Sequence, residues 1–134
     1  MRCIFICLLC LCLCGCTYYA PPGEAHGSRV ITSVEVTATE DGQLHRYHYN
    51  TETKVRTILT YLRRIKPELA VSIDPDTFRT EQYCVTLHLS DGSQTVYRQL
   101  HTEYLQKDYG VWRSIDPAHG SALVRILKEL PPDK

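Results

Sequence analysis

Three residues near the C-terminal end carry the side chains that serine hydrolases use. Asp116, His119 and Ser121 provide a carboxylate, an imidazole and a hydroxyl. In such enzymes the fold brings these groups together from separate segments. Here they lie within six residues of one another, and Asp116-Pro117 is typical of a helix start, where aspartate caps backbone N–H groups and proline fits the first turn. We therefore interpret Asp116 as a helix cap and predict no catalytic residue on this segment.

The histidines are the next candidates, as metal ligands. His45 and His48 are three residues apart in a predicted strand, so their side chains point to opposite faces. His88 and His101 lie on the two strands of a predicted hairpin, but a two-residue turn places His88 opposite Thr95. We expect these four to be surface histidines and predict no metal site.

Acidic residues and the remaining thiol also have simple structural interpretations. Asp74, Asp76 and Glu81 offer oxygen ligands, but a Ca²⁺ site takes about six to eight oxygens, so we favour a solvated loop with Asp-capped turns. Cys84 lies in a predicted strand with no activating pattern around it, which indicates a half-buried structural cysteine. The sequence has no phosphate-binding glycine loop, HExxH motif, GxSxG elbow or EF-hand loop, and we expect no cofactor.

The size and the charge of the chain exclude further classes of function. The chain has 134 residues, which fits one domain, and its 43% of hydrophobic residues can form a packed core. Its 15 Lys and Arg balance 15 Asp and Glu. A nucleic-acid binder would show a basic excess, so we expect no nucleic-acid partner.

The other cysteines gather at the N-terminus. Six of the seven lie in the first sixteen residues: Cys3, Cys7, Cys10, Cys12, Cys14 and Cys16. Metal-binding thiolates need a folded, hydrogen-bonded shell, but their neighbours here are almost all apolar. Met1-Arg2 gives one positive charge, and the apolar run that follows is too short to span a membrane, which needs about 20 residues. This pattern is typical of a secretory signal.

The end of that segment, Leu13-Cys14-Gly15-Cys16, resembles the lipobox of bacterial lipoproteins. The family more often has Ala, Ser, Thr or Val where Cys14 stands, and cysteine is similarly small. The resemblance covers only the leader. It implies cleavage between Gly15 and Cys16, fatty acylation of Cys16, and anchoring in the cell membrane or the outer membrane, facing the extracytoplasmic side. An ordinary cleaved signal or an uncleaved anchor is the alternative.

The resulting division of the chain has three parts. Residues 1–15 are a lipoprotein signal peptide, and residues 16–28 are the lipidated cysteine and a flexible tether that contains two prolines and two glycines. Residues 29–134 form a single domain.

Two hairpins are predicted in that domain. Residues 30–39 alternate and are β-branched, Asp41-Gly42 suits a tight turn, and residues 44–50 return. A two-residue turn puts Val34, Val36 and Ala38 on one face with His45, Tyr47 and Tyr49.

The second hairpin joins residues 83–89 and 95–100 through Asp91-Gly92. Its apolar set, which includes Tyr83, Val96 and Leu100, has the opposite parity. Either one of the two loops differs from a simple two-residue turn, or the two halves are merely similar in architecture.

Helices follow each hairpin. The first helix is predicted from apolar residues that recur at helical spacing: Val55, Ile58, Leu59, Leu62 and Ile65. Asn50 or Thr51 can cap the start of this helix, and Pro67 prevents it from continuing. A second helix begins at Asp116-Pro117, with Ala122, Leu123, Ile126, Leu127 and Leu130 as its apolar stripe. We expect Leu62 and Ile126, the central residues of the two stripes, to be buried.

These elements predict an α+β fold: a four-stranded antiparallel sheet with two helices on one face, as two strand–strand–helix units.

The irregular stretch from Gln99 to Ser114 is the candidate binding segment. Its aromatic residues and an arginine are the residue types that dominate interfaces, and functional residues favour loops on a rigid scaffold. The candidate binding residues are Tyr104, Tyr109, Trp112 and Arg113. Alternatively, Trp112 and Tyr109 seal the end of the sheet.

Two function classes are consistent with these patterns. The first is a membrane-anchored extracytoplasmic lipoprotein whose domain is a non-enzymatic binding module, with an envelope protein or a wall polymer as partner. The second is a small envelope hydrolase or metal-dependent enzyme whose site is assembled only in three dimensions. The lack of a catalytic motif favours the binding module.

Overall fold

The computed structural model describes residues 30–74, 76 and 81–134. The predicted signal peptide, lipidation site and tether lie outside these residues. In chain order the elements are β1 (Ile31–Glu40), β2 (Gln43–Tyr49), α2 (Glu52–Arg64), β3 (Ala70–Val71), β4 (Gln82–Leu89), β5 (Gln94–Leu100), β6 (Tyr104–Lys107), β7 (Trp112–Ser114) and α3 (Pro117–Glu129).

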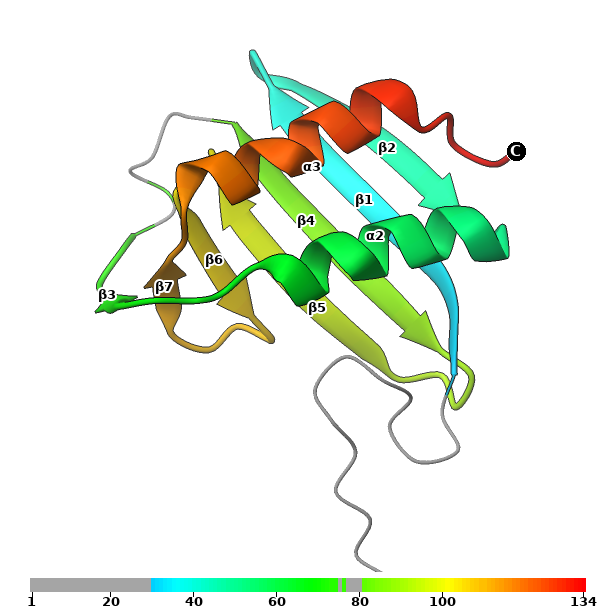
Figure 1. The fold of residues 1–134 in the computed structure, drawn as a ribbon, viewed down its shortest axis with the longest axis horizontal. Helices are drawn as coiled ribbons and strands as arrows, with labels where there is room; N and C mark the ends of the chain where they lie inside the picture. Colours follow the sequence, from blue (N-terminus) through cyan, green and yellow to red (C-terminus); the bar gives the residue numbers. More distant parts are fainter. Residues whose placement is uncertain (1–29, 75, 77–80) are drawn as a thin grey trace, which may run out of the picture.

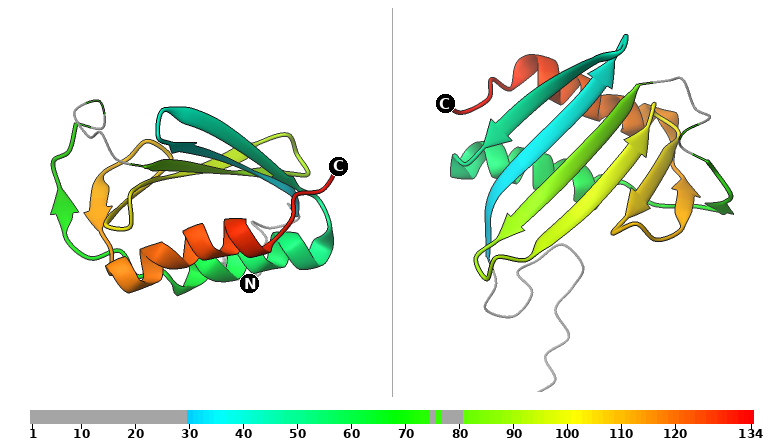
Figure 2. Two further views of the ribbon diagram at one scale, coloured as in Figure 1. Left: turned by 90° about the horizontal axis from the view of Figure 1, so that it is seen from above. Right: turned by 180° about the vertical axis from the view of Figure 1, so that it is seen from behind.

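The strands form one seven-stranded sheet in the order β2-β1-β4-β5-β6-β7-β3, and every neighbouring pair is antiparallel. Both helices lie side by side on one face of this sheet (Figure 1). The view from above in Figure 2 shows the two layers, with the other sheet face left without helices. The α+β class and the two helices on one face were predicted, but the four-stranded sheet was wrong.

The difference comes from three short strands. The segment from Gln99 to Ser114, predicted to be irregular, contains the end of β5 and the strands β6 and β7, and the two residues of β3 pair with β7 at the sheet edge. Strands of two to four residues are too short to show an alternating pattern in a sequence. β6 pairs with β5, β7 with β6 and β3 with β7, so each short strand depends on a neighbour in the sheet, which is a tertiary effect.

The first hairpin has the predicted register. Asp41 and Gly42 form a two-residue turn, and both have positive φ (51° and 75°), as the tight turn requires. Val34 therefore lies opposite Tyr49 and Val36 opposite Tyr47, on the face that the helices cover.

The second hairpin has a longer turn than the first. The Leu89 N–H donates to the Ser93 carbonyl, and the Gly92 N–H, at a residue with φ 86°, donates to the Leu89 carbonyl. This three-residue loop shifts the register by one residue. Tyr97 thus lies opposite Val85 on the helix-covered face, while Val96 and Leu100, predicted on that face, lie on the open one.

The core lies between the helices and the long strands β1 and β4. Ile58 of α2 and Leu123 of α3 are fully buried against Val34, Val36 and Val85.

The central residues of the two apolar helix stripes are less buried than predicted. Leu62 and Ile126, expected to be buried, are only half-buried. Tyr61 is buried instead of Leu62, and its hydroxyl donates to the buried amide oxygen of Gln99. Leu62 faces the part of the sheet that α3 does not cover.

An aspartate lies at the start of each of these two helices. Asp116 accepts a hydrogen bond from the Ala118 N–H at 2.9 Å, which confirms it as a cap. At α2, Thr51 occupies the cap position without a capping bond from its own side chain.

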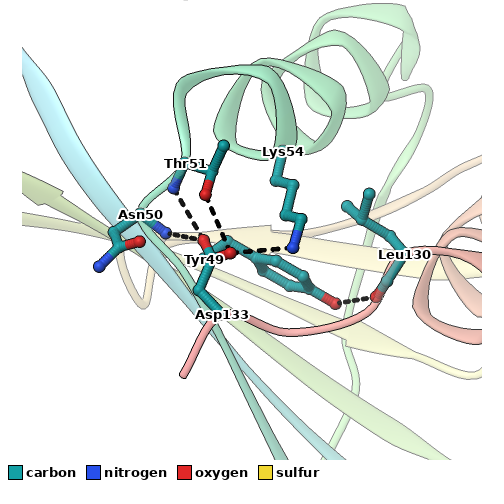
Figure 3. A network of polar contacts seen from close by, with 6 residues as sticks. All are labelled: Tyr49, Asn50, Thr51, Lys54, Leu130 and Asp133. Carbon is teal, nitrogen blue, oxygen red and sulfur yellow. Dashed lines mark hydrogen bonds and ion pairs between the residues drawn. The ribbon is translucent and has the colours of Figure 1, made fainter.

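Asp133, from the C-terminal tail, binds the two residues that precede the first turn of α2 (Figure 3). Its carboxylate accepts from the backbone N–H groups of Asn50 and Thr51, both at 2.8 Å, and pairs with Lys54 at 2.9 Å. These contacts and the Lys54 charge hold the pKa of Asp133 well below its usual range. The tail is thereby fixed beside β2, where the Asp133 N–H also donates to the His48 carbonyl.

Candidate functional site

A cavity of about 400 Å³ lies between α2 and the half of the sheet that α3 leaves uncovered. Leu59 and Leu62 of α2 form one wall, and Leu87 and Leu89 of β4 and Leu105 of β6 form the other. All five side chains are apolar, and the three on the strands are buried. The cavity therefore has the apolar lining and the size, at the lower end of about 300–1,000 Å³, that small-molecule sites have.

The fold creates this cavity from ordinary elements. The helix-facing parity of β4 and β6 places leucines at alternate positions beneath α2. The α2 helix ends at Arg64, and Ile65 and Pro67 beyond it complete the lining. No residue of α3 lines the cavity, so nothing from the second helix fills the space beside Leu62.

Three cations stand among the lining residues, and none of the described residues that line the cavity is acidic. Arg63 comes from the last turn of α2, Lys107 from the end of β6 and Arg113 from β7. All three side chains are exposed, which puts them at the solvent side of the cavity. Cations around a low-dielectric hollow concentrate a positive potential there.

Neutral contacts hold two of these cations. The Lys107 Nζ lies 5.8 Å from the centre of the Tyr97 ring, a cation–π contact across the β5–β6 pair. An Arg113 guanidinium N–H donates to the Glu68 carbonyl oxygen at 3.2 Å.

The four candidate binding residues do not form one surface. Trp112 is 6% exposed, in line with the alternative that it packs at the end of the sheet, and Tyr104 on β6 is half-buried on the same open face. Tyr109 is 68% exposed in the β6–β7 turn, so it does not seal the sheet. Arg113 points to the opposite face, because it follows Trp112 in the strand, and there it lines the cavity.

Tyr109 and Trp112 share a contact that the sequence did not reveal. The guanidinium of Arg98 on β5 lies 5.8 Å from the Tyr109 ring centre and 5.4 Å from that of Trp112. It also donates to the Gln106 side-chain oxygen at 3.3 Å. Arg98 therefore covers the indole on the open face, where a planar cation can stack on aromatic rings.

The arrangement nearest to a catalytic relay lies elsewhere, at the β5–β6 turn. A His101 ring nitrogen is 3.5 Å from a Glu81 carboxylate oxygen, and the other is 3.0 Å from the Thr102 hydroxyl. The Glu81 contact exceeds the roughly 2.6–3.2 Å of a catalytic hydrogen bond, and both side chains are largely exposed. Exposure to water weakens any effect of the carboxylate on the imidazole.

The other residues considered for chemistry are dispersed. His45 and His48 lie on opposite faces of β2, as predicted, and Ser121 donates to the Ala118 carbonyl within its own helix turn. Asp74 accepts from the Asp76 N–H, which is the Asp-capped turn expected of that loop. Within the described part of the chain, no three His, Cys, Asp or Glu side chains lie close enough together to hold a metal ion.

Most of the cavity residues were missed by sequence reasoning. Leu59 and Leu62 were predicted to be core residues, and Arg113 was predicted to be a binding residue for a different reason. Lys107 and Arg113 share the segment after β5 with Glu103 and Asp108, so no excess of charge marks the two cations in the sequence.

Neither helix in the described part of the chain is long and apolar enough to cross a membrane. Comparison with protein-family models, with curated proteins and with solved structures finds no match for this chain.

Proposed function

We propose that the protein is a lipid-anchored, extracytoplasmic binding domain without catalytic activity, and that it holds an apolar small molecule in the cavity between α2 and the sheet. The observation that carries this proposal is the cavity itself. Protein interiors are close-packed, and apolar space left open costs stability in proportion to its volume. A ligand that fills the space beside Leu59 and Leu62 recovers those lost contacts.

The anchor is the second part of the proposal, and it rests on Leu13-Cys14-Gly15-Cys16. The described chain enters the domain at Val30, whose backbone pairs with Ser90 beside the β4–β5 turn. The next residue, Ile31, lines the cavity. The cavity therefore lies close to the point where the tether joins the domain, which suits a site that receives molecules from a membrane.

The enzymatic alternative has weaker support. Its best evidence is the set of Glu81, His101 and Thr102, which is exposed to water and has one long contact. A binding module needs only the shaped, apolar cavity that the structure contains.

A neutral apolar dye tests the proposed binding. N-phenyl-1-naphthylamine becomes fluorescent in apolar surroundings, and we expect a saturable increase with the purified chain from residue 17 onwards. Leu62→Trp fills the cavity and abolishes the increase. Leu44→Trp is the matched control, because Leu44 is exposed on β2 and does not line the cavity. Equal dye binding by both variants, or none by the unaltered chain, contradicts the proposal.

Mass spectrometry of the membrane fraction tests the anchor. The unaltered protein should begin at Cys16 and carry acyl chains, while Cys16→Ala should leave an unmodified and uncleaved precursor. An unmodified mature form released from wild-type cells contradicts lipidation.

A further inference from the structure

The cations at the cavity are arranged to meet one charged group. Leu105 and Lys107 are two residues apart in β6 and so share a face, and Arg113 pairs with Leu105 from the adjacent strand β7. Lys107 and Arg113 thus flank one leucine of the cavity wall. Arg63 reaches the same cavity from α2, on the opposite wall.

Like charges placed around one hollow repel each other, and an apolar wall strengthens that repulsion because it lowers the local dielectric. The printed contacts of Lys107 and Arg113 are with the Tyr97 ring and the Glu68 carbonyl oxygen, and neither of these groups carries a formal charge. Asp108, the acidic residue that follows Lys107, accepts from the Val96 N–H. Arg63 lies in the last turn of a helix, where a cation complements the helix dipole. The helix dipole does not act on Lys107 and Arg113, which lie on strands.

The size of the cavity limits the apolar part of a ligand. If each methylene occupies about the 30 Å³ that a water molecule takes in the liquid, 400 Å³ holds roughly a dozen of them. That is one acyl chain of medium length.

From the charge and the volume together, we infer that the ligand is a single-chain amphiphile with a carboxylate head, that is, a fatty acid of about twelve carbons. The chain lies between Leu62 and Leu87, and the carboxylate meets Lys107 and Arg113 at the solvent side. A guanidinium binds a carboxylate through two parallel N–H···O bonds, which makes Arg113 the better anchor of the two. This inference rests on the proposed function, because it assumes that the cavity is a binding site.

Displacement of the neutral dye by two ligands with the same chain separates the head from the tail. Dodecanoate and 1-dodecanol, both below the concentrations at which they aggregate, differ only in the charged head. We expect dodecanoate to displace the dye at an at least about tenfold lower concentration, since a charge-assisted contact is roughly twice as strong as a neutral one. Dodecylamine, with the opposite charge, should displace it least.

The matched variants assign that preference to the cations. Lys107→Gln with Arg113→Gln should remove the advantage of dodecanoate over dodecanol, measured within the variant as the ratio of the concentrations at which the two ligands displace the dye. Arg64→Gln with Lys66→Gln removes the same charge from residues that do not line the cavity, and it should preserve the advantage. Lys107→Arg keeps the charge and should keep the preference.

The outcomes distinguish the two proposals. If the dye binds but dodecanoate and dodecanol displace it equally, or if the control pair abolishes the preference as strongly as the cavity pair, the inference is overturned and the binding function stands. If the dye does not bind at all, the proposed function fails, and the inference fails with it.

Discussion

A buried polar cluster joins both helices to the sheet, and its removal should be measurable. Gln99 of β5 is 2% exposed. Its side-chain oxygen accepts from the Tyr61 hydroxyl of α2, and its side-chain nitrogen donates to the carbonyl oxygens of His101 at 2.8 Å and Gly120 at 3.1 Å. Burial raises the pKa of Tyr61 far above its ordinary value, so the hydroxyl is a donor across the whole working range of pH.

The expected cost follows from which groups lose their partners. Tyr61→Phe leaves the Gln99 oxygen buried without a donor, which costs about 1–3 kcal/mol. Gln99→Leu keeps the volume but deprives the Tyr61 hydroxyl and the buried Gly120 carbonyl of their partner, so we expect a larger cost, about 2–4 kcal/mol. In the double variant no Tyr–Gln bond is left to break, so its cost should fall short of the sum of the two by about 1–2 kcal/mol.

Urea unfolding followed by circular dichroism measures these free energies. Tyr109→Phe is the control, because the same hydroxyl is removed from an exposed ring, and it should cost under about 0.5 kcal/mol. The reasoning is refuted if Tyr61→Phe costs no more than Tyr109→Phe, or if the double variant loses the full sum of the two single costs.

Three further predictions concern packing and charge. Gly120→Ala should destabilise strongly, by about 1–3 kcal/mol or more, because a Cβ would lie 2.2 Å from the Thr102 carbonyl oxygen; a melting temperature within a degree of wild type would contradict this. Ile58→Ala, at a fully buried position of α2, should cost about 2–5 kcal/mol in urea unfolding, whereas Arg56→Ala on the exposed side should cost under about 0.5 kcal/mol. The pKa of Asp133 is depressed, so the contribution of this carboxylate to stability is fully present above its unfolded pKa of 3.8 and is lost as the pH falls below that value. Asp133→Asn should therefore lower the Tm at pH 7 and reduce the decline of the Tm between pH 4 and pH 2, as measured by thermal melts. Equal pH dependence of the Tm in both proteins would contradict the assignment.

The long elements could be predicted because their patterns are local. The hairpin at Asp41-Gly42 followed from turn chemistry, and for the opposite parity at Asp91-Gly92 a different loop was one of two explanations. That loop is longer, but it places Val96 and Leu100 on the open face, against the prediction. The helices followed from their spacing of apolar residues, and Asp116 from its place before a proline. All of these signals lie within a few residues of the structure that they describe.

The missed features depend on contacts between distant segments. β6 and β7 are too short for a pattern; β6 pairs with β5, and β7 pairs with β6. The burial of Tyr61 in place of Leu62 comes with a hydrogen bond to Gln99, which is far away in the sequence. Sequence alone also could not show that Trp112 and Arg113, predicted as one binding surface, point to opposite faces, since that required knowing that they lie in a strand.

The start of α2 is another such case. Asn50 and Thr51 were the expected capping residues, but Thr51 makes no capping bond from its side chain. The backbone N–H groups of both residues donate to Asp133 of the C-terminal tail, 83 and 82 residues away in the sequence.

The position of the ligand is the most direct test of the central claim, and a two-dimensional ¹H–¹⁵N spectrum of the labelled chain, recorded during titration with dodecanoate, measures it. The cavity account predicts that the largest shift changes fall on Leu62, Lys107 and Arg113 and saturate together with one affinity. Changes concentrated instead at Tyr109 and the open face of the sheet, or no saturable change at any amide, would contradict it.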